Sequence, residues 1–391
     1  MNNVRSKLLY VISYVDVLAV SLIIPLFNQH LQSMGISNVK IGLLGSIYSA
    51  VQFFASPIIG HTSDVYGSKR VLIVTLLTCS ICYPIMGQAT TFIAMLTIRP
   101  IIGFAKHTQL LCKNYIQEST DDEKEHFRIF GNLNGFTSLG YIIGPVISGY
   151  LINTENGYSN MCCVTGILFA VNALISYFLQ IKSKKKPSQR RSTNFITSFK
   201  HIPWATCWDL FLLKCLAVFA MFSFYLNYHT AMTTRFGTTS VQNGYSLSLQ
   251  GLVRALAAFF IHKIFELFPN HLNTSHRMRI IYGILIVTFS ALYLSSSFYL
   301  FLVFLVPLNV CLCFIRIVNH DALVERIKDH QKGIILGAFN NVTAVCRFIL
   351  PLCSGYIVDV FGYDGSYLIS ILSLVVGLIV ISMYSVRQKV D

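Results

Sequence analysis

The sequence predicts an all-α membrane protein with twelve transmembrane helices in two pseudo-twofold six-helix bundles. Three observations support this fold class. Hydrophobic residues make up 54% of the 391 residues and charged residues only 12%, about half the charged fraction of an average soluble protein. Apolar runs of about 20 residues, long enough to cross a bilayer, recur along the whole chain. A segment rich in glycine in the first half reappears in the second half.

The repeated segment covers residues 131–150 and matches residues 337–356 at one constant spacing. Gly131, Asn134 and Pro145 have identical counterparts in the second copy, as does the closing Ser-Gly-Tyr. In a soluble helix an interior glycine costs about 1 kcal/mol and a proline about 3 kcal/mol. In a membrane helix the same residues let a neighbouring helix approach closely and mark bends. The repeat therefore predicts two related halves, each with this packing helix at the equivalent place.

The apolar runs divide the chain into two bundles joined by a polar segment. Residues 1–181 are expected to form the first bundle, residues 182–207 a basic cytoplasmic linker, and residues 208–391 the second bundle. Helices are expected at residues 8–29, 41–60, 71–89, 92–113, 129–152, 161–181, 208–229, 240–262, 279–297, 299–319, 333–357 and 366–386.

The basic residues fall on one side of this arrangement. With both termini in the cytoplasm, the outer loops carry only Lys40 and Arg235, and the remaining loop lysines and arginines lie inside. The positive-inside rule then predicts cytoplasmic termini and leaves open a plasma or an organelle membrane. Anionic headgroups explain the net charge of +14, so no nucleic-acid partner is expected. The eleven cysteines lie mostly inside apolar runs, which predicts buried thiols and no metal site.

Three local motifs carry a family resemblance. The loop after the second expected helix contains Gly60, Asp64, Gly67 and Lys69 in a GxxxDxxGxK pattern, and the fourth helix contains an RxxxG pattern that begins at Arg99. The fifth expected helix carries the packing motif Gly131, Gly140, Gly144, Pro145 and Gly149.

With the two related halves, these motifs resemble the major facilitator superfamily. The stretches VDVLAVSLIIP, SAVQFFASPIIGHTSD and TIRPIIGFAKH resemble its tetracycline-resistance-like drug/proton antiporter branch, and the chain is also similar to an orphan animal branch. The resemblance implies alternating access, proton antiport, and a central cavity lined by the first and fourth helix of each half. It also implies a gating loop formed by Gly60, Asp64, Gly67 and Lys69 with Arg128. Val65 and Ser68 replace basic residues of that loop.

Ionisable residues inside the expected helices are the candidates for chemistry, because such groups are costly in lipid. Asp16, Arg99, Lys106, Arg254 and Arg347 form this set, with Asp16 as its only acid. At about 1.5 Å of rise per residue, depth favours an Asp16–Lys106 pair, and the length of arginine also allows Asp16–Arg99. These three residues are expected either to couple protons to transport or to form a static buried ion pair.

One acid among four bases predicts a positive site that favours an organic anion, for example a carboxylate or a phosphate. Arg254 and Arg347 are the charged candidates for the substrate cavity, and Gln52 and Asn340 are the uncharged ones. The alternative for the arginines is to cap helix carbonyls, and for the amides to form hydrogen bonds between helices.

We therefore expect a monomeric secondary active transporter of a small organic solute that works by alternating access. Proton-coupled antiport is the leading mode, and a facilitative or anion-coupled carrier is the alternative. A non-transporting membrane receptor is the alternative from another class. The chain has no GxxxxGK[ST] loop for nucleotide phosphates, and no cluster of acids and histidines suggests an enzyme. No cofactor is expected, and the partners are a small-molecule substrate, protons and the lipid bilayer.

Overall fold

The computed structural model describes residues 3–119, 123–179, 204–260, 274–327 and 332–387. These residues form helices and no strands, which confirms the all-helical prediction. The chain divides into two compact units, residues 1–190 with 232–252, and residues 191–231 with 253–391. Most of the predicted linker, residues 182–203, lies outside the described residues.

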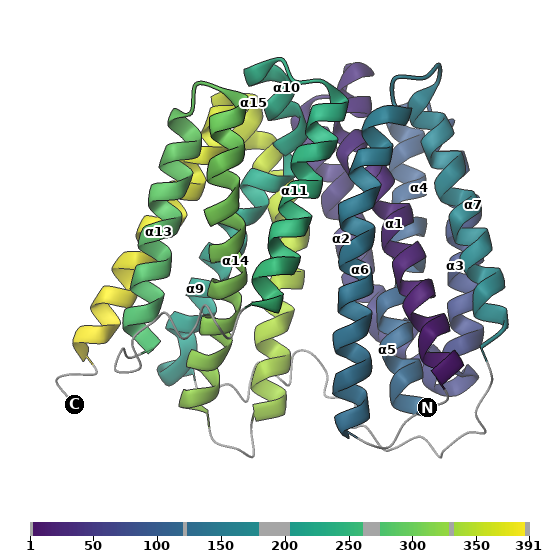
Figure 1. The fold of residues 1–391 in the computed structure, drawn as a ribbon, viewed down its shortest axis with the longest axis horizontal. Coiled ribbons are helices and arrows are strands. Elements are labelled where there is room, and N and C mark those ends of the chain that lie inside the picture. Colours follow the sequence, from purple (N-terminus) through teal and green to yellow (C-terminus); the bar gives the residue numbers. More distant parts are fainter. Residues whose placement is uncertain (1–2, 120–122, 180–203, 261–273, 328–331, 388–391) are drawn as a thin grey trace. The chain divides into compact units, whose positions relative to one another are not determined.

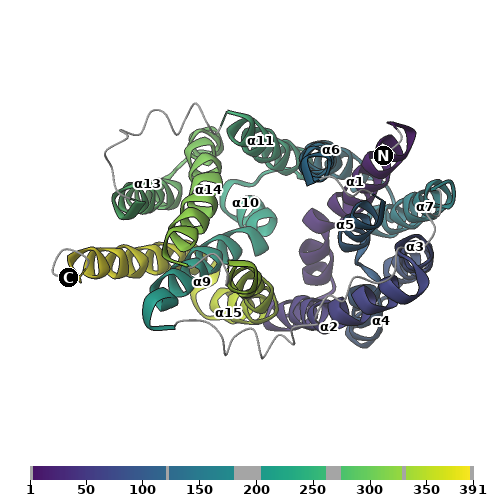
Figure 2. The same cartoon turned by 90° about the horizontal axis from the view of Figure 1, so that it is seen from below.

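The described part of the first unit contains seven helices that precede the linker, together with the end of one later helix and the first part of the next (Figure 1). They are α1 (Asn3–Ser33), α2 (Asn38–Tyr66), α3 (Ser68–Gly87), α4 (Phe92–Ala105), α5 (Thr108–Ser119), α6 (Glu123–Leu151) and α7 (Gly157–Tyr177). Within this unit α6 runs beside α1, α7 beside α3, and α2 beside α4 (Figure 2).

The remaining helices are α9 (Trp204–Leu226), α10 (Tyr228–Phe236), α11 (Ser240–Phe259), α13 (Thr274–Leu294), α14 (Phe298–Arg326) and α15 (Lys332–Arg387). Residues 232–252, which include the first part of α11, group with the first unit, and the rest of α11 groups with the second. Within the second unit α15 packs along α9, and α13 packs on α14 and α15.

The helices account for all twelve expected spans, with three differences in their boundaries. The span at residues 92–113 is broken into α4 and α5, and the span at residues 208–229 runs from α9 into α10. The last two spans form one helical element, α15, which bends at Gly362, where φ is 69°. Glycine adopts this left-handed conformation at no steric cost.

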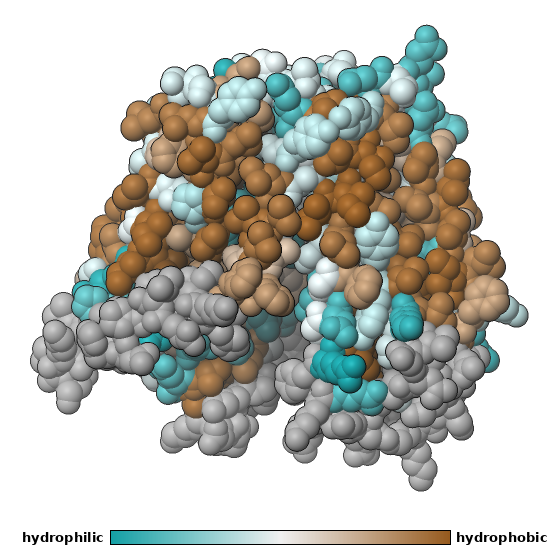
Figure 3. Space-filling view, in the orientation of Figure 1, coloured by the Kyte–Doolittle hydropathy of each residue, from teal (hydrophilic) through white to brown (hydrophobic). Residues whose placement is uncertain are grey.

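Among the described residues, eight helices are long and apolar enough to cross a membrane, and α15 counts as one of them. α4 and α5 are too short because of the break between them. α6 and α11 are long enough, but glycines and polar side chains lower their hydropathy. On the face shown in Figure 3, hydrophobic side chains largely cover the middle of α13, α11 and α7, and hydrophilic ones gather at the lower end of α6.

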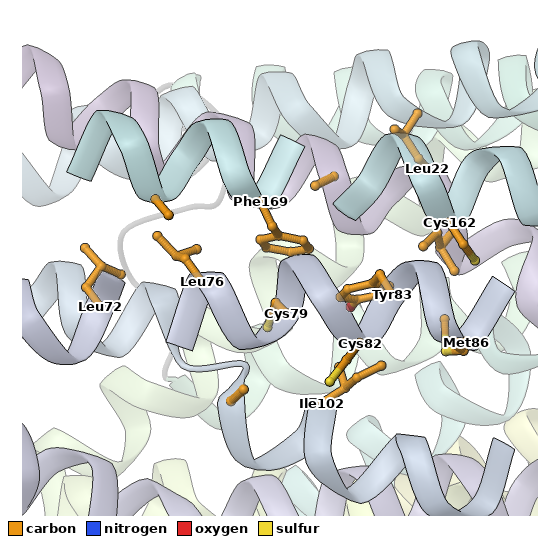
Figure 4. Packing of buried hydrophobic residues seen from close by; sticks show 14 of the residues in the cluster. Leu22, Leu72, Leu76, Cys79, Cys82, Tyr83, Met86, Ile102, Cys162 and Phe169 are labelled. Carbon is orange, nitrogen blue, oxygen red and sulfur yellow. The ribbon is translucent and has the colours of Figure 1, made fainter. Parts of the chain in front are cut away.

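The core of the first unit lies between α1, α3 and α7 (Figure 4). The ring of Phe169 on α7 stacks on Tyr83 of α3, with 5.2 Å between the centroids. Cys79 and Cys82 lie in the same apolar cluster as buried free thiols. This core holds α1 and α3 in place around the polar residues described below.

Gly140 and Gly144 bring α6 into backbone contact with α1. A Cβ atom at Gly140 would lie 2.8 Å from the backbone nitrogen of Leu18, and one at Gly144 would overlap Ser21. The Ser21 hydroxyl donates a hydrogen bond of 2.9 Å to the carbonyl of Gly140. Gly149 of the same motif meets α11, because a Cβ there would lie 2.6 Å from the carbonyl oxygen of Ser240. Gly131, by contrast, has no atom within 4 Å of the same test position.

We predict that Gly140→Ala destabilises the protein, because the backbone of α1 would have to move. Overpacking of this kind costs about 1–3 kcal/mol. Gly131→Ala is the matched control on the same helix, and its better helix propensity should add up to about 1 kcal/mol. Thermal unfolding of both variants in detergent measures the difference. Equal shifts of the two midpoints would contradict the close contact.

Candidate coupling and substrate sites

Asp16 is buried in α1 and forms an ion pair with Lys106, at the junction of α4 and α5. Its side chain is 1% exposed and that of Lys106 10%. Gln109 Nε2 donates a hydrogen bond of 3.3 Å to Oδ2 of Asp16. The structure thus brings together the two groups that the depth estimate favours, and it adds Gln109, which sequence reasoning missed.

The break between α4 and α5 lies at Lys106 itself. Lys106 leaves the helical conformation, with φ −79° and ψ 74°, so its carbonyl is no longer used within a continuous helix. Gln52 Nε2 on α2 donates to this carbonyl at 2.7 Å. Gln52, a predicted substrate-cavity residue, therefore bonds to backbone here, which is the inter-helix role named as its alternative.

Arg99 is held by aromatic rings rather than by Asp16. Its guanidinium carbon lies 3.5 Å from the centroid of the Phe27 ring and 5.4 Å from that of Tyr48. The Nε atom is buried without a hydrogen-bond partner, and no ion pair to Arg99 occurs among the described residues. Attraction to the ring faces stabilises the cation in this position but leaves its charge uncompensated.

The other predicted substrate-cavity residues lie in the second unit. The guanidinium of Arg254 on α11 is 5.3 Å from the Tyr225 ring centroid. Asn340 on α15 accepts a hydrogen bond of 3.3 Å from Lys214 Nζ. Arg347 is exposed on α15 and pairs with no described acid.

Asp209, Lys214 and Arg316 lie inside expected spans of the second unit but were missing from the predicted set. Asp209 is a second buried carboxylate, and Arg326 donates to both of its oxygens at 2.8 and 2.7 Å. Asp16 is therefore not the only acid among the helices. Lys214 and Arg316 lie within the expected spans 208–229 and 299–319, so their charge inside apolar runs was the signal that could have found them.

The gating loop is organised by Gly67 and Glu118. Gly67 ends α2 with φ 88°, and its N–H donates to the carbonyl of Ser63 at 2.8 Å. Ser68, which replaces a basic residue of the motif, donates through its hydroxyl and its N–H to Glu118 of α5. Lys69 lies over the Tyr177 ring, 5.2 Å from its centroid.

The remaining gating residues form no latch with each other. Asp64 on α2 and Arg128 on α6 are both exposed, and neither has an ion-pair partner among the described residues. Gly60 has open space where a Cβ would lie. The gating role of Asp64 and Arg128 stays a prediction.

Comparison with known proteins gives one family and several relatives. The family model described as Major Facilitator Superfamily matches residues 8–350. An uncharacterized MFS-type transporter of Methanocaldococcus jannaschii is 24% identical over 382 residues, which cover 95% of this chain and 96% of that protein. The class C tetracycline resistance protein of Escherichia coli is 26% identical over 63% of each chain. A crystal structure of the nucleoside transporter NupG shares the fold with a TM-score of 0.79, at 15% identity over 98% of this chain and 99% of that one.

We predict that Asp16→Asn destabilises the protein, because it leaves the buried Lys106 without a carboxylate. Breaking one partner of a buried pair costs about 3–5 kcal/mol. The double variant Asp16→Asn/Lys106→Met removes both charges and should recover most of that loss. A double-mutant cycle on thermal unfolding in detergent measures the coupling. If the two substitutions act additively, the pair contributes no interaction energy.

Proposed function

Because the chain belongs to the Major Facilitator Superfamily, we propose that it is a secondary active transporter of a small organic anion, coupled to protons through Asp16. Membership of the family, together with helices apolar enough to cross the bilayer, makes the chain a multi-pass membrane transporter. The observation that carries the finer proposal is the buried pair of Asp16 and Lys106. Ionisable groups at membrane depth most often serve transport.

The position of Asp16 lets a change of charge act on the helices. Protonation would remove the negative charge and release the Lys106 ammonium. Lys106 lies where α4 ends, and Gln52 of α2 bonds to its carbonyl. Loss of the ion pair therefore acts directly on the junction of α4 and α5, and a change at this junction can favour one access state over the other.

The charge balance supports an anion as the substrate. Lys106 already compensates Asp16, and Arg326 compensates Asp209. Arg99 and Arg347 then remain as cations without an acid among the described residues. Cations without a compensating acid favour negative solutes over cationic ones. We also propose, from the basic loops, that both termini are cytoplasmic.

The direction of coupling has two candidates. The resemblance to the drug/proton antiporter branch favours exchange of the anion against protons. Lys106 supports the second candidate, in which proton and anion move together. An ammonium freed by protonation of Asp16 can bind the anion, so both ligands would favour the same state, and such coupling is reciprocal. A carrier without a proton step is the remaining alternative.

We predict that a pH gradient drives anion accumulation in proteoliposomes containing this protein. With the membrane potential clamped, one coupled proton and a gradient of one unit allow about tenfold accumulation. A sulfonate such as toluenesulfonate is the probe, because it stays charged and leaks little. Exchange concentrates it on the acidic side, and cotransport concentrates it on the alkaline side.

Asp16→Asn should abolish the accumulation while gradient-free exchange of labelled for unlabelled anion persists. Lys40→Met, an exposed lysine outside the site, is the control that should behave as the wild type. Wild-type flux that ignores the gradient would refute coupling to protons. Transport of the neutral sulfonamide at the same rate would refute the anion.

A further inference from the structure

We propose that Lys214 and Arg316 form a subsite in the second unit that binds the carboxylate, sulfonate or phosphate head of an organic anion. The inference rests on the proposed function, because it assigns the part of the chain that recognises the transported anion. Lys214 belongs to α9 and Arg316 to α14, two helices of the same unit.

Lys214 is fixed in place by α15 and keeps free hydrogen-bonding capacity. Its Nζ lies 3.9 Å from the centroid of the Phe339 ring and donates to Asn340 Oδ1 at 3.3 Å. Phe339 is 2% exposed, so its ring is a buried floor beneath the ammonium. An ammonium has three donors. The Asn340 bond uses one of them, and the ring does not neutralise the charge.

Arg316 adds a second positive charge on the helix next to that of Lys214. It is exposed on α14, which packs against α9. Neither residue forms an ion pair within the described parts of the chain. Two like charges in an apolar helix bundle repel each other, and a bound anion would relieve that repulsion.

The helix directions place the two cations at similar depth. Lys214 lies before the middle of α9, and Arg316 lies after the middle of α14, by about 1.5 and 6 Å respectively. The hydrogen bonds between Asp209, near the start of α9, and Arg326, at the end of α14, show that the helices run antiparallel. Both cations are therefore displaced from the middle toward the same end of the helix pair.

The two acids nearest the Asp209 end of α9 and α14 have other partners. Asp209 is bonded to Arg326, and Glu325 accepts hydrogen bonds from Thr274 at 3.0 and 2.9 Å. Arg254 lies near the same region, because Cys313, three residues before Arg316 on α14, donates to the Arg254 carbonyl at 3.8 Å. The surroundings of Lys214 and Arg316 are thus more positive still, which favours an anion as ligand.

Equilibrium binding to the purified full chain tests this assignment. Isothermal titration calorimetry in phosphatidylcholine nanodiscs compares toluenesulfonate with toluenesulfonamide, its neutral counterpart. The wild type should bind the sulfonate and bind the sulfonamide at least about tenfold more weakly. Lys214→Met and Arg316→Gln should each weaken sulfonate binding about tenfold or more, and Lys214→Arg should largely retain it.

Lys40→Met is the matched control, since Lys40 also lies over a phenylalanine ring, 5.7 Å from the centroid of Phe92. It should leave binding unchanged. If Lys214→Met fails to fold, Arg316→Gln and Lys214→Arg still decide the question. Absence of sulfonate binding to the wild type at millimolar concentration, or binding that survives Arg316→Gln in a folded protein, would overturn the proposal.

A lipid headgroup has the same chemistry as the proposed ligand, so nanodiscs with phosphatidylglycerol form a second arm. Full competition by this lipid would assign the pair to lipid and overturn the substrate subsite. The binding measurement applies no pH gradient, so it does not test the coupling of protons to transport. If sulfonate binding depends on Lys214 but a pH gradient drives no flux, proton coupling alone is refuted. If the gradient drives flux but sulfonate binding does not depend on Lys214, the subsite alone is refuted.

Discussion

The ion pair between Asp16 and Lys106 determines how several helices of the first unit are joined. A carboxylate that is 1% exposed must be compensated, because an isolated charge is several kcal/mol less stable in an apolar interior than in water. The compensating lysine lies where the backbone leaves the helix between α4 and α5. The carbonyl of Lys106 then needs a donor, and Gln52 supplies it from α2. One buried charge thereby links α1, α2, α4 and α5.

The two copies of the repeated helix achieve the same packing with different chemistry. In the first unit, α6 contacts α1 through Gly140 and Gly144, and backbone meets backbone. In the second unit, Cys346 occupies the position equivalent to Gly140, and its sulfur lies 3.9 Å from that of Cys215 on α9. Asn227 on the α9–α10 connection and Ser354 on α15 bond at 2.7 Å. The repeated helix thus keeps an equivalent neighbour in both units, α1 in the first and α9 in the second, but the atoms in contact differ.

Much of the fold could be predicted from the sequence, because apolar length and the positions of glycine and proline report directly on membrane helices. The superfamily and its tetracycline-resistance relatives were predicted from local motifs and are confirmed by the comparisons; the likeness to an orphan animal branch stays a prediction. The partner of Asp16 could be estimated from depth alone. The break at Lys106 could not, since Pro100 and Gly103, six and three residues before it, both lie inside α4. Lys214 and Arg316 were overlooked because a pattern of single helices does not show which charges meet.

The seam between α1 and α6 has a consequence for how the protein tolerates change. Any side chain larger than hydrogen at Gly140 meets the backbone of α1. Substitution at this position is therefore unfavourable, even though the residue lies in no proposed binding site. Arg316 and Arg347 of the second unit stand on exposed faces and can be exchanged at little structural cost. Selection for a new solute would therefore alter the residues that recognise it long before it altered the glycines. Invariant glycines along α6 would then reflect its close packing against α1. Variable residues around Arg316 would reflect changes in the transported solute.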